Sequence, residues 1–178
     1  LPKKPATLLK NVLTHDDTPV EIRFDNLNAE VTFAAGNLKC RLIEGRYPNY
    51  NSVIPTDNPC QMTIDRRALL GSVKRILPFA SESSQSIRLR LGIGQVEASS
   101  EDIDFATSAK ETIVCDYNGT PMSIGFKGPS LVEILSSLTS DEVLMELADP
   151  SRPCLIFPSE QPEGQNILML IMPMLLND

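Results

Sequence analysis

One structural plan recurs about three times along this chain. Met62-Thr63-Ile64 leads into a stretch with apolar residues at helical spacing, and Met122-Ser123-Ile124 leads into a second such stretch. A third helical stretch, without a preceding strand, lies at residues 1–13. A repeated unit of this size buries its apolar face only by stacking on copies of itself. We therefore expect an α+β fold of repeated units, which favours a surface or a ring over a deep catalytic pocket.

Within each unit, the pattern predicts one helix followed by about three antiparallel strands, with a leading strand before the helix. The helices are expected at residues 1–13, 65–79 and 128–138, where apolar residues recur three and four positions apart. We expect Asp65 to cap the second helix and Pro78 to help end it. Alternating runs predict strands with one buried face. Gly92-Ile93-Gly94 and Asn118-Gly119 are typical of hairpin turns, because these residues accept a positive φ at low cost.

Residues 45–59 do not follow the repeat. They hold three prolines and two tyrosines without helical periodicity, so they should be extended and lie outside any sheet interior. A domain boundary is expected at such a segment. We predict that residues 1–55 are the second half of one domain plus a linker and that residues 56–178 are a complete two-unit domain. Because the first unit lacks its leading strand, we expect Leu1 to be a cut inside a longer protein.

The charge distribution is uneven. The net charge is −7, from 16 basic and 23 acidic residues, which taken alone argues against a nucleic-acid-binding protein. The basic residues of the first two helices are Lys3, Lys4, Lys10, Arg66, Arg67, Lys74 and Arg75, opposed only by Asp65. A basic helical face on an acidic body can follow phosphates. Ordinary solvated helix faces explain the same pattern, and composition alone favours that explanation.

Residues that could support catalysis or bind a metal are scattered. No window approaches the roughly 18 apolar residues of a membrane span. Cys40, Cys60, Cys115 and Cys154 have no C-x-x-C spacing, so we expect reduced thiols in a cytoplasmic protein and no metal site. The single histidine, His15, lies in a polar turn without a Ser or Cys partner. We expect a protein that is not an enzyme and needs no cofactor.

Two separated motifs carry a resemblance to a known family. The first is Glu44-Gly45-Arg46-Tyr47-Pro48-Asn49-Tyr50 followed by Val53-Ile54-Pro55, and the second is the terminal Met172-Pro173-Met174. Together with the repeat, they resemble the bacterial sliding clamp, the beta subunit of DNA polymerase III, over the full length of the chain. The resemblance implies a DNA-clamp fold with helices on the inner face and sheets outside. It also implies a processivity factor of replication, in which two subunits form a homodimeric ring around duplex DNA.

The resemblance also implies three groups of site residues. A groove that binds short peptides of DNA polymerase III, the clamp loader and other clamp-motif proteins would use Pro48, Val53, Leu170, Ile171, Met172, Pro173, Met174 and Leu175. The DNA-facing residues would be Lys3, Lys4, Lys10, Arg66, Arg67, Lys74 and Arg75. The subunit interface would use Leu77, Pro78, Phe79, Ile87 and Leu89. Ser52 and Leu175 stand where many family members carry a basic residue, so polar contacts with the peptide should differ.

Two other interpretations remain open from the sequence. One is a generic protein-interaction module of repeated units, which binds partners through the Met-Pro-Met tail and has no role on DNA. The other is a small-ligand enzyme built around Glu101, Asp102 and Asp104. Asp102 and Asp104 would be neighbours on one face of a strand. Solubilisation of an exposed strand explains these acids equally well.

Overall fold

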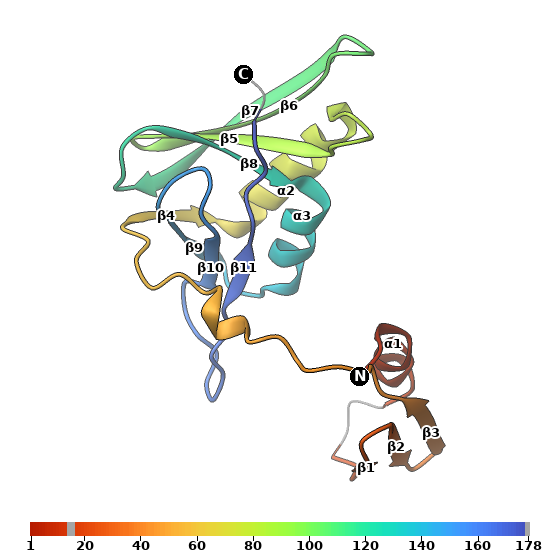
Figure 1. Cartoon of the computed structure of the whole chain (residues 1–178). Coiled ribbons are helices and arrows are strands. Elements are labelled where there is room, and N and C mark those ends of the chain that lie inside the picture. Colours follow the sequence, from red (N-terminus) through yellow and green to blue (C-terminus); the bar gives the residue numbers. More distant parts are fainter. Residues whose placement is uncertain (14–16, 177–178) are drawn as a thin grey trace. The chain divides into compact units, whose positions relative to one another are not determined.

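A computed structural model describes residues 1–13 and 17–176 of the chain (Figure 1). The chain forms two compact units, Leu1–Pro48 and Asn49–Asp178. The division falls inside the segment that the sequence marks as a linker. Among the described residues, no helix is both long and apolar enough to cross a membrane.

The first unit consists of one helix and three antiparallel strands. Its elements are α1 (Lys3–Val12), β1 (Glu21–Phe24), β2 (Asn28–Phe33) and β3 (Gly36–Arg41), with the strand order β1-β2-β3. The turn between β1 and β2 is held by Asp25, whose Oδ1 accepts hydrogen bonds from the backbone N–H groups of Leu27 and Asn28, both at 2.7 Å. These two bonds favour the ionised carboxylate and hold the pKa of Asp25 below its ordinary value.

The second unit contains the helix-and-strand plan twice. Its first half is η1 (Tyr50–Ser52), β4 (Cys60–Asp65), α2 (Arg66–Ile76), η2 (Leu77–Phe79), β5 (Ser86–Gly92), β6 (Gln95–Asp102) and β7 (Thr107–Tyr117). Its second half is β8 (Met122–Lys127), α3 (Gly128–Ser137), β9 (Glu142–Leu147), β10 (Cys154–Pro158) and β11 (Met169–Ile171). The strands form one sheet in the order β11-β10-β9-β4-β7-β6-β5-β8. The predicted repeat is therefore confirmed.

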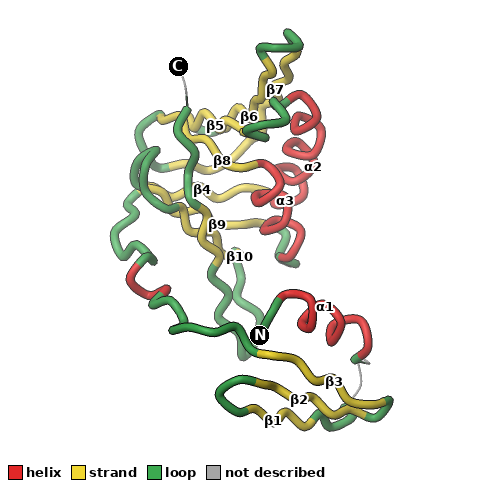
Figure 2. The backbone as a smooth tube through the Cα atoms, turned by 45° about the vertical axis from the view of Figure 1, so that its right-hand side comes forward, coloured by secondary structure: helices red, strands yellow, loops and turns green. Residues whose placement is uncertain are grey.

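The two halves of the second unit complete each other. The leading strand of each half pairs with the first strand after the helix of the other half, β4 with β9 and β8 with β5. After β11 the chain returns to β8, where the N–H of Met174 donates to the carbonyl of Gly125 at 2.8 Å, so the sheet nearly closes on itself. Helices α2 and α3 contact each other and lie side by side on one side of the sheet (Figure 2).

The core of the second unit lies between these helices and the sheet. Leu69, Val73 and Leu131 are fully buried on the helices, against Ile87 and Phe126 on the strands. The Asp65 side chain caps α2 as predicted, because its Oδ1 accepts a hydrogen bond from Ala68 N at 2.7 Å. Pro78 does not end α2 directly. The α-helix stops at Ile76, and Pro78 sits in the short 3-10 turn that follows.

The Asn118-Gly119 turn differs from the prediction of a hairpin. It joins β7 to β8, which do not pair with each other, and Gly119 does not adopt a positive φ. Its role is close packing, since a Cβ at Gly119 would lie 2.4 Å from the Tyr117 hydroxyl and 2.8 Å from Cys60 Sγ. Burial raises the pKa of Tyr117 to about 12, so its hydroxyl stays protonated and donates to the Thr120 carbonyl at 2.8 Å. By contrast, the predicted turn at Gly94 is confirmed by its φ of 76°.

We expect Gly119→Ala to lower the free energy of unfolding by about 1–3 kcal/mol, because the new methyl group overpacks the Tyr117 and Cys60 side chains. Urea denaturation followed by circular dichroism measures this change. Gly92→Ala is the matched control, since its Cβ would meet its nearest atom, the Gln95 carbonyl oxygen, at an ordinary 3.8 Å. Equal destabilisation by both substitutions would contradict the packing argument.

Candidate binding surfaces

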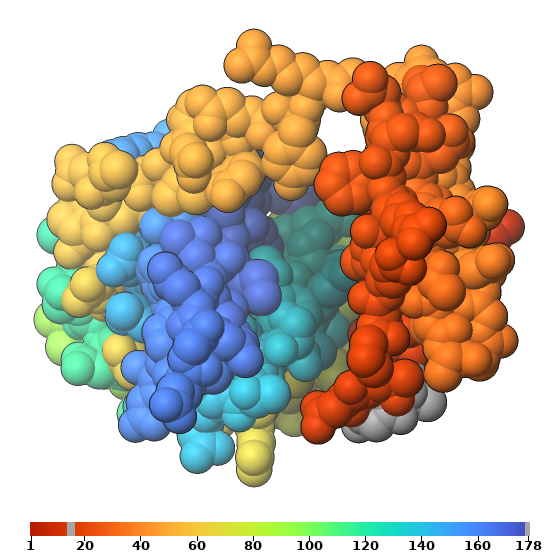
Figure 3. Space-filling model, turned by 90° about the horizontal axis from the view of Figure 1, so that it is seen from below, coloured from red at the N-terminus to blue at the C-terminus, as the bar shows by residue number. Residues whose placement is uncertain are grey.

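The C-terminal tail combines one anchored residue with several accessible apolar ones. Strand β11 pairs with β10, which turns the Ile171 side chain into the core. Met172 and Leu175 are 56% and 89% exposed, whereas Leu170, Pro173 and Met174 are half-buried. Figure 3 shows the blue segment that leads into the tail at the surface of the second unit. Of the residues expected in a peptide groove, Ile171 therefore supports the surface from below and does not form part of it.

The linker residues of the expected groove fall in different units. Val53 follows η1 and is exposed within the second unit, together with the tail. Pro48 is the last residue of the first unit. Ser52, which replaces a basic residue common in the resembling family, uses its hydroxyl locally and donates to the Asn49 carbonyl at 2.7 Å. Its side chain thus stabilises the 3-10 turn and supplies no charge.

The end of the tail also lines a polar hollow that the sequence did not predict. A cavity of about 830 Å³ lies over β5, β6 and β7, with Met174, Leu175 and Leu176 at its rim. Its other lining residues include Arg88, Arg90, Glu97, Glu101, Asp102 and Lys110. Glu97 lies 3.8 Å from Arg90 and 3.7 Å from Lys110, so the charges of this hollow largely offset one another. Such a surface has no strong preference for either sign of ligand charge.

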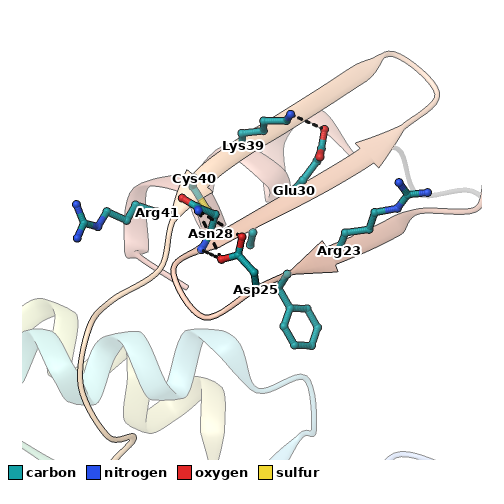
Figure 4. Close-up of a pocket in the computed structure, with 9 residues that line it drawn as sticks. Arg23, Asp25, Asn28, Glu30, Lys39, Cys40 and Arg41 are labelled. Carbon is teal, nitrogen blue, oxygen red and sulfur yellow. Dashed lines mark hydrogen bonds and ion pairs between the residues drawn. The ribbon is translucent and has the colours of Figure 1, made fainter.

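A smaller cavity, of about 580 Å³, lies on the three-stranded sheet of the first unit. Phe24, Ala29 and Cys40 form an apolar row across the three strands, and polar or charged side chains line the rest. Figure 4 shows Lys39 and Glu30 pointing toward each other, with Lys39 Nζ 3.2 Å from Glu30 Oε1. Within residues 1–13 and 17–176, no group of three or more His, Cys, Asp or Glu side chains could hold a metal ion.

The acidic cluster near Asp102 has a structural role. Asp102 is buried, and its Oδ1 accepts hydrogen bonds from the backbone N–H groups of Asp104 and Phe105 at 3.0 and 3.2 Å. This carboxylate closes the turn between β6 and β7, whereas Glu101 and Asp104 are exposed. The arrangement does not support the interpretation as an enzyme site. His15 lies outside the described residues, and the four cysteines are free thiols.

The basic residues of α1 and α2 fall into two groups, exposed lysines and arginines whose guanidinium groups form hydrogen bonds or ion pairs. Lys3, Lys4 and Lys10 on α1 and Lys74 on α2 are exposed. The second group consists of three arginines of α2. Arg66 donates from Nε to the Ser140 carbonyl at 2.6 Å and from Nη1 to the Leu135 carbonyl at 3.1 Å. Arg67 lies 3.6 Å from Asp141, and Arg75 donates two hydrogen bonds of 2.7 Å to Glu111. Arg66 thus holds the loop after α3 onto α2, a role that the sequence did not predict.

The pair between Arg75 and Glu111 joins the last turn of α2 to β7. The hydrogen bonds from Arg75 hold the pKa of Glu111 below its ordinary value, and the same bonds raise the pKa of Arg75. Since Arg75 is already bound to a carboxylate, its charge is partly neutralised at the helix surface. The neighbouring Lys74 has no ion pair with the residues that the structure describes, so no carboxylate neutralises its positive charge at this end of α2.

The expected subunit interface is wrong in one part. Ile87 and Leu89 are fully buried in the core of the second unit, and β5 is hydrogen-bonded on both sides, to β6 and to β8. These side chains cannot reach a second subunit. Pro78 and Phe79 are exposed, whereas Leu77 is half-buried. Strands in the sequence show alternation but not which edge they occupy, so the pattern could not separate an inner strand from an edge strand.

An accessible sheet edge lies along β7. Residues 107–114 pair with β6 on one side, and β4 takes the other side only at residues 115–117. Along Thr107–Val114 the second side therefore has no strand partner within the described part of the chain. An unpaired edge presents a row of backbone donors and acceptors that another strand can use. Val114, 82% exposed, adds an apolar side chain to this edge.

The arrangement of the second unit, two half-units that exchange leading strands with paired helices on one side, is found in solved structures of DNA sliding clamps. A crystal structure of the DNA polymerase sliding clamp from Pseudomonas aeruginosa is 24% identical and has a TM-score of 0.90, over 99% of this chain and 47% of that chain. The corresponding structure from Caulobacter crescentus, also 24% identical, has a TM-score of 0.89 over 99% of this chain and 46% of that chain. These likenesses establish the DNA-clamp fold.

Sequence comparison places the chain more narrowly. Residues 51–175 match the family model of the DNA polymerase III beta subunit, C-terminal domain, and the chain belongs to this family. The beta sliding clamp of Caulobacter vibrioides is 25% identical over 95% of this chain and 45% of its own length. That of Haemophilus influenzae is 27% identical over 99% of this chain and 47% of its own length. The chain thus spans about half the length of the curated relatives it matches.

We expect Arg66→Ala to lower the free energy of unfolding by about 1.5–3 kcal/mol, since it removes two charge-assisted hydrogen bonds and leaves two carbonyl groups without them. Arg67→Ala is the matched control: it neighbours Arg66, but its side chain is 75% exposed and its ion pair is long. The control should change stability by less than about 0.5 kcal/mol. Thermal denaturation distinguishes the two, and equal effects would show that Arg66 has no special structural role.

Proposed function

We propose that this chain is part of a ring-shaped clamp that encircles duplex DNA in the bacterial cytoplasm and acts as a processivity factor in replication. In this role it catalyses no reaction and tethers DNA polymerase III and other partners to the template. Membership in the DNA polymerase III beta subunit family carries the proposal. The fold supports it, because helices α2 and α3 form a continuous layer on one side of the sheet.

Contact with DNA in this proposal is electrostatic and independent of sequence. A clamp that slides must neutralise phosphates without reading bases, since base contacts would fix its position. The exposed Lys3, Lys4, Lys10 and Lys74 are suited to such contact. Arg66 and Arg75 contribute less, because carbonyl groups or a carboxylate already occupy their guanidinium groups.

Partner binding is assigned to the apolar tail. Met172 and Leu175 are exposed, and flexible methionine side chains adapt to different apolar anchors of a peptide. The related clamp of Pseudomonas aeruginosa has been solved bound to griselimycin, which supports a ligand site on clamps of this fold. The clamp loader and other clamp-motif proteins would use the same surface, and subunits of a homodimeric ring would meet through the β7 edge together with Phe79.

We expect a labelled peptide of the Gln-Leu-x-Leu-Phe type to bind the chain, and Met172→Ser with Leu175→Ser to raise its dissociation constant about tenfold or more, because exposed apolar anchors dominate such contacts. Fluorescence anisotropy measures this. Ile93→Ser is the matched control, since this hairpin residue is comparably exposed, far from the tail in sequence, and outside the proposed site. Loss of affinity in the control alone, or no difference between the variants, would rule out the tail as the binding surface.

We expect replacement of Lys3, Lys4 and Lys10 by alanine to weaken binding to duplex DNA at low ionic strength equally for unrelated sequences. Each lost phosphate contact should reduce the slope of log affinity against log salt by about 0.9. Anisotropy titrations over a range of salt concentrations test this. Lys39→Ala, which removes an exposed lysine on β3, is the control. An unchanged slope in the triple variant would favour the alternative of an interaction module without a role on DNA.

A further inference from the structure

The C-terminal tail is held to the sheet at two points. At the first, β11 is paired with β10, and Ile171 is buried. At the second, the N–H of Met174 donates to the Gly125 carbonyl on β8 at 2.8 Å. Strands β11 and β8 stand at opposite ends of the strand order, so the tail connects one end of the sheet to the other (Figure 1). Only Met172 and Pro173 bridge the two anchors.

The bridge between the anchors has little conformational freedom. Pro173 restricts its own φ to about −65° and restricts Met172, which precedes it, to extended backbone. Beyond the bridge, exposure alternates along the tail: Leu175 is exposed, whereas Met174 and Leu176 on either side of it are half-buried. The exposed Met172 and Leu175 are therefore presented by backbone that is already ordered in the free chain.

The second anchor depends on the absence of a side chain at Gly125. This residue is buried, and a Cβ at its position would lie 2.6 Å from Leu176 Cδ2 and 3.0 Å from the Met174 carbonyl oxygen. The first distance is well inside the contact distance of about 3.5–4.0 Å between carbon atoms. Leu176 thus occupies the space that a side chain at Gly125 would need. Among the described residues, β8 has no strand partner on this side beyond the bridge to Met174, so the contact at Gly125 decides whether the tail stays on β8.

We propose that Gly125 is a positioning residue for partner binding, which holds the tail on β8 and thereby orders Met172 and Leu175. The inference rests on the proposed function of the tail as the peptide-binding surface. A partner that meets an ordered tail avoids the loss of side-chain and loop freedom that binding to a released tail would require. Gly125 does not adopt a positive φ, so glycine is needed here for space and not for backbone conformation.

Amide hydrogen exchange of the 178-residue chain, measured by NMR, tests whether Gly125 holds the tail. The Met174 amide is hydrogen-bonded, so we expect it to be protected, and Gly125→Ala should reduce its protection about tenfold or more. Amides of β4 and β9 should keep their protection, which separates release of the tail from loss of the fold. Gly92→Ala is the matched control, since its Cβ would meet its nearest atom at 3.8 Å.

Leu176→Ala supplies a second, coupled variant. It removes the Leu176 atoms nearest to a Cβ at Gly125 and leaves the 3.0 Å approach to the Met174 oxygen, which a small shift of the tail relieves. In the Leu176→Ala background, Gly125→Ala should therefore reduce the protection of Met174 less than about threefold, a non-additivity expected of residues in contact. Because Leu176 is only half-buried, we expect this variant to fold.

Peptide affinity measures what the positioning contributes to binding. Gly125→Ala should raise the dissociation constant of a labelled Gln-Leu-x-Leu-Phe peptide about tenfold, because the peptide must then order the tail, whereas Gly92→Ala should not change it. Fluorescence anisotropy measures both. Failure of the unaltered chain to bind the peptide would reject the proposed function, whereas exchange at Met174 decides independently whether Gly125 holds the tail.

Three results would overturn the inference. One is unchanged protection of Met174 in Gly125→Ala, which would mean that the tail stays on β8 without this glycine. The second is an equal effect of Gly125→Ala with and without the Leu176 side chain, which would place the effect outside this contact. The third is a released tail with unchanged peptide affinity, which would limit Gly125 to packing.

Discussion

The second unit depends on the reciprocal exchange of leading strands between its two halves. Strand β4 opens the first half but pairs with β9 of the second, and β8 opens the second half but pairs with β5 of the first. Neither half can complete its sheet alone, so the halves must fold as one cooperative body. The tail contributes to this closure, because the N–H of Met174 bonds back to Gly125 on β8.

This exchange decides which surfaces remain for binding. It occupies both sides of β5, which buries Ile87 and Leu89, and it leaves one side of residues 107–114 of β7 without a strand partner among the described residues. It also places α2 and α3 together on one side of the sheet. A body of this kind offers helix surfaces and sheet edges to its partners. The acids at the β6–β7 turn are used for turn closure, as the hydrogen bonds to Asp102 show.

Much of this architecture could be predicted from the sequence, because it follows from periodicity. Helical spacing predicted the three α-helices that the structure describes, and the side chain of Asp65 marked the start of α2. Register and edge position could not be predicted, since they depend on pairings between residues far apart in the chain. For that reason the burial of Leu89, the packing role of Gly119 and the internal hydrogen bonds of Arg66 became visible only in three dimensions.

The two units therefore differ in completeness and not in plan. The pattern that buries Leu89 on β5 leaves Phe24 on β1 largely exposed, since among the described residues the helix-and-strand plan occurs twice in the second unit and once in the first. A half-unit must present an apolar face and an open strand edge, because these are the features that its counterpart would cover. The exposed residues of the first unit are for this reason a consequence of the repeat.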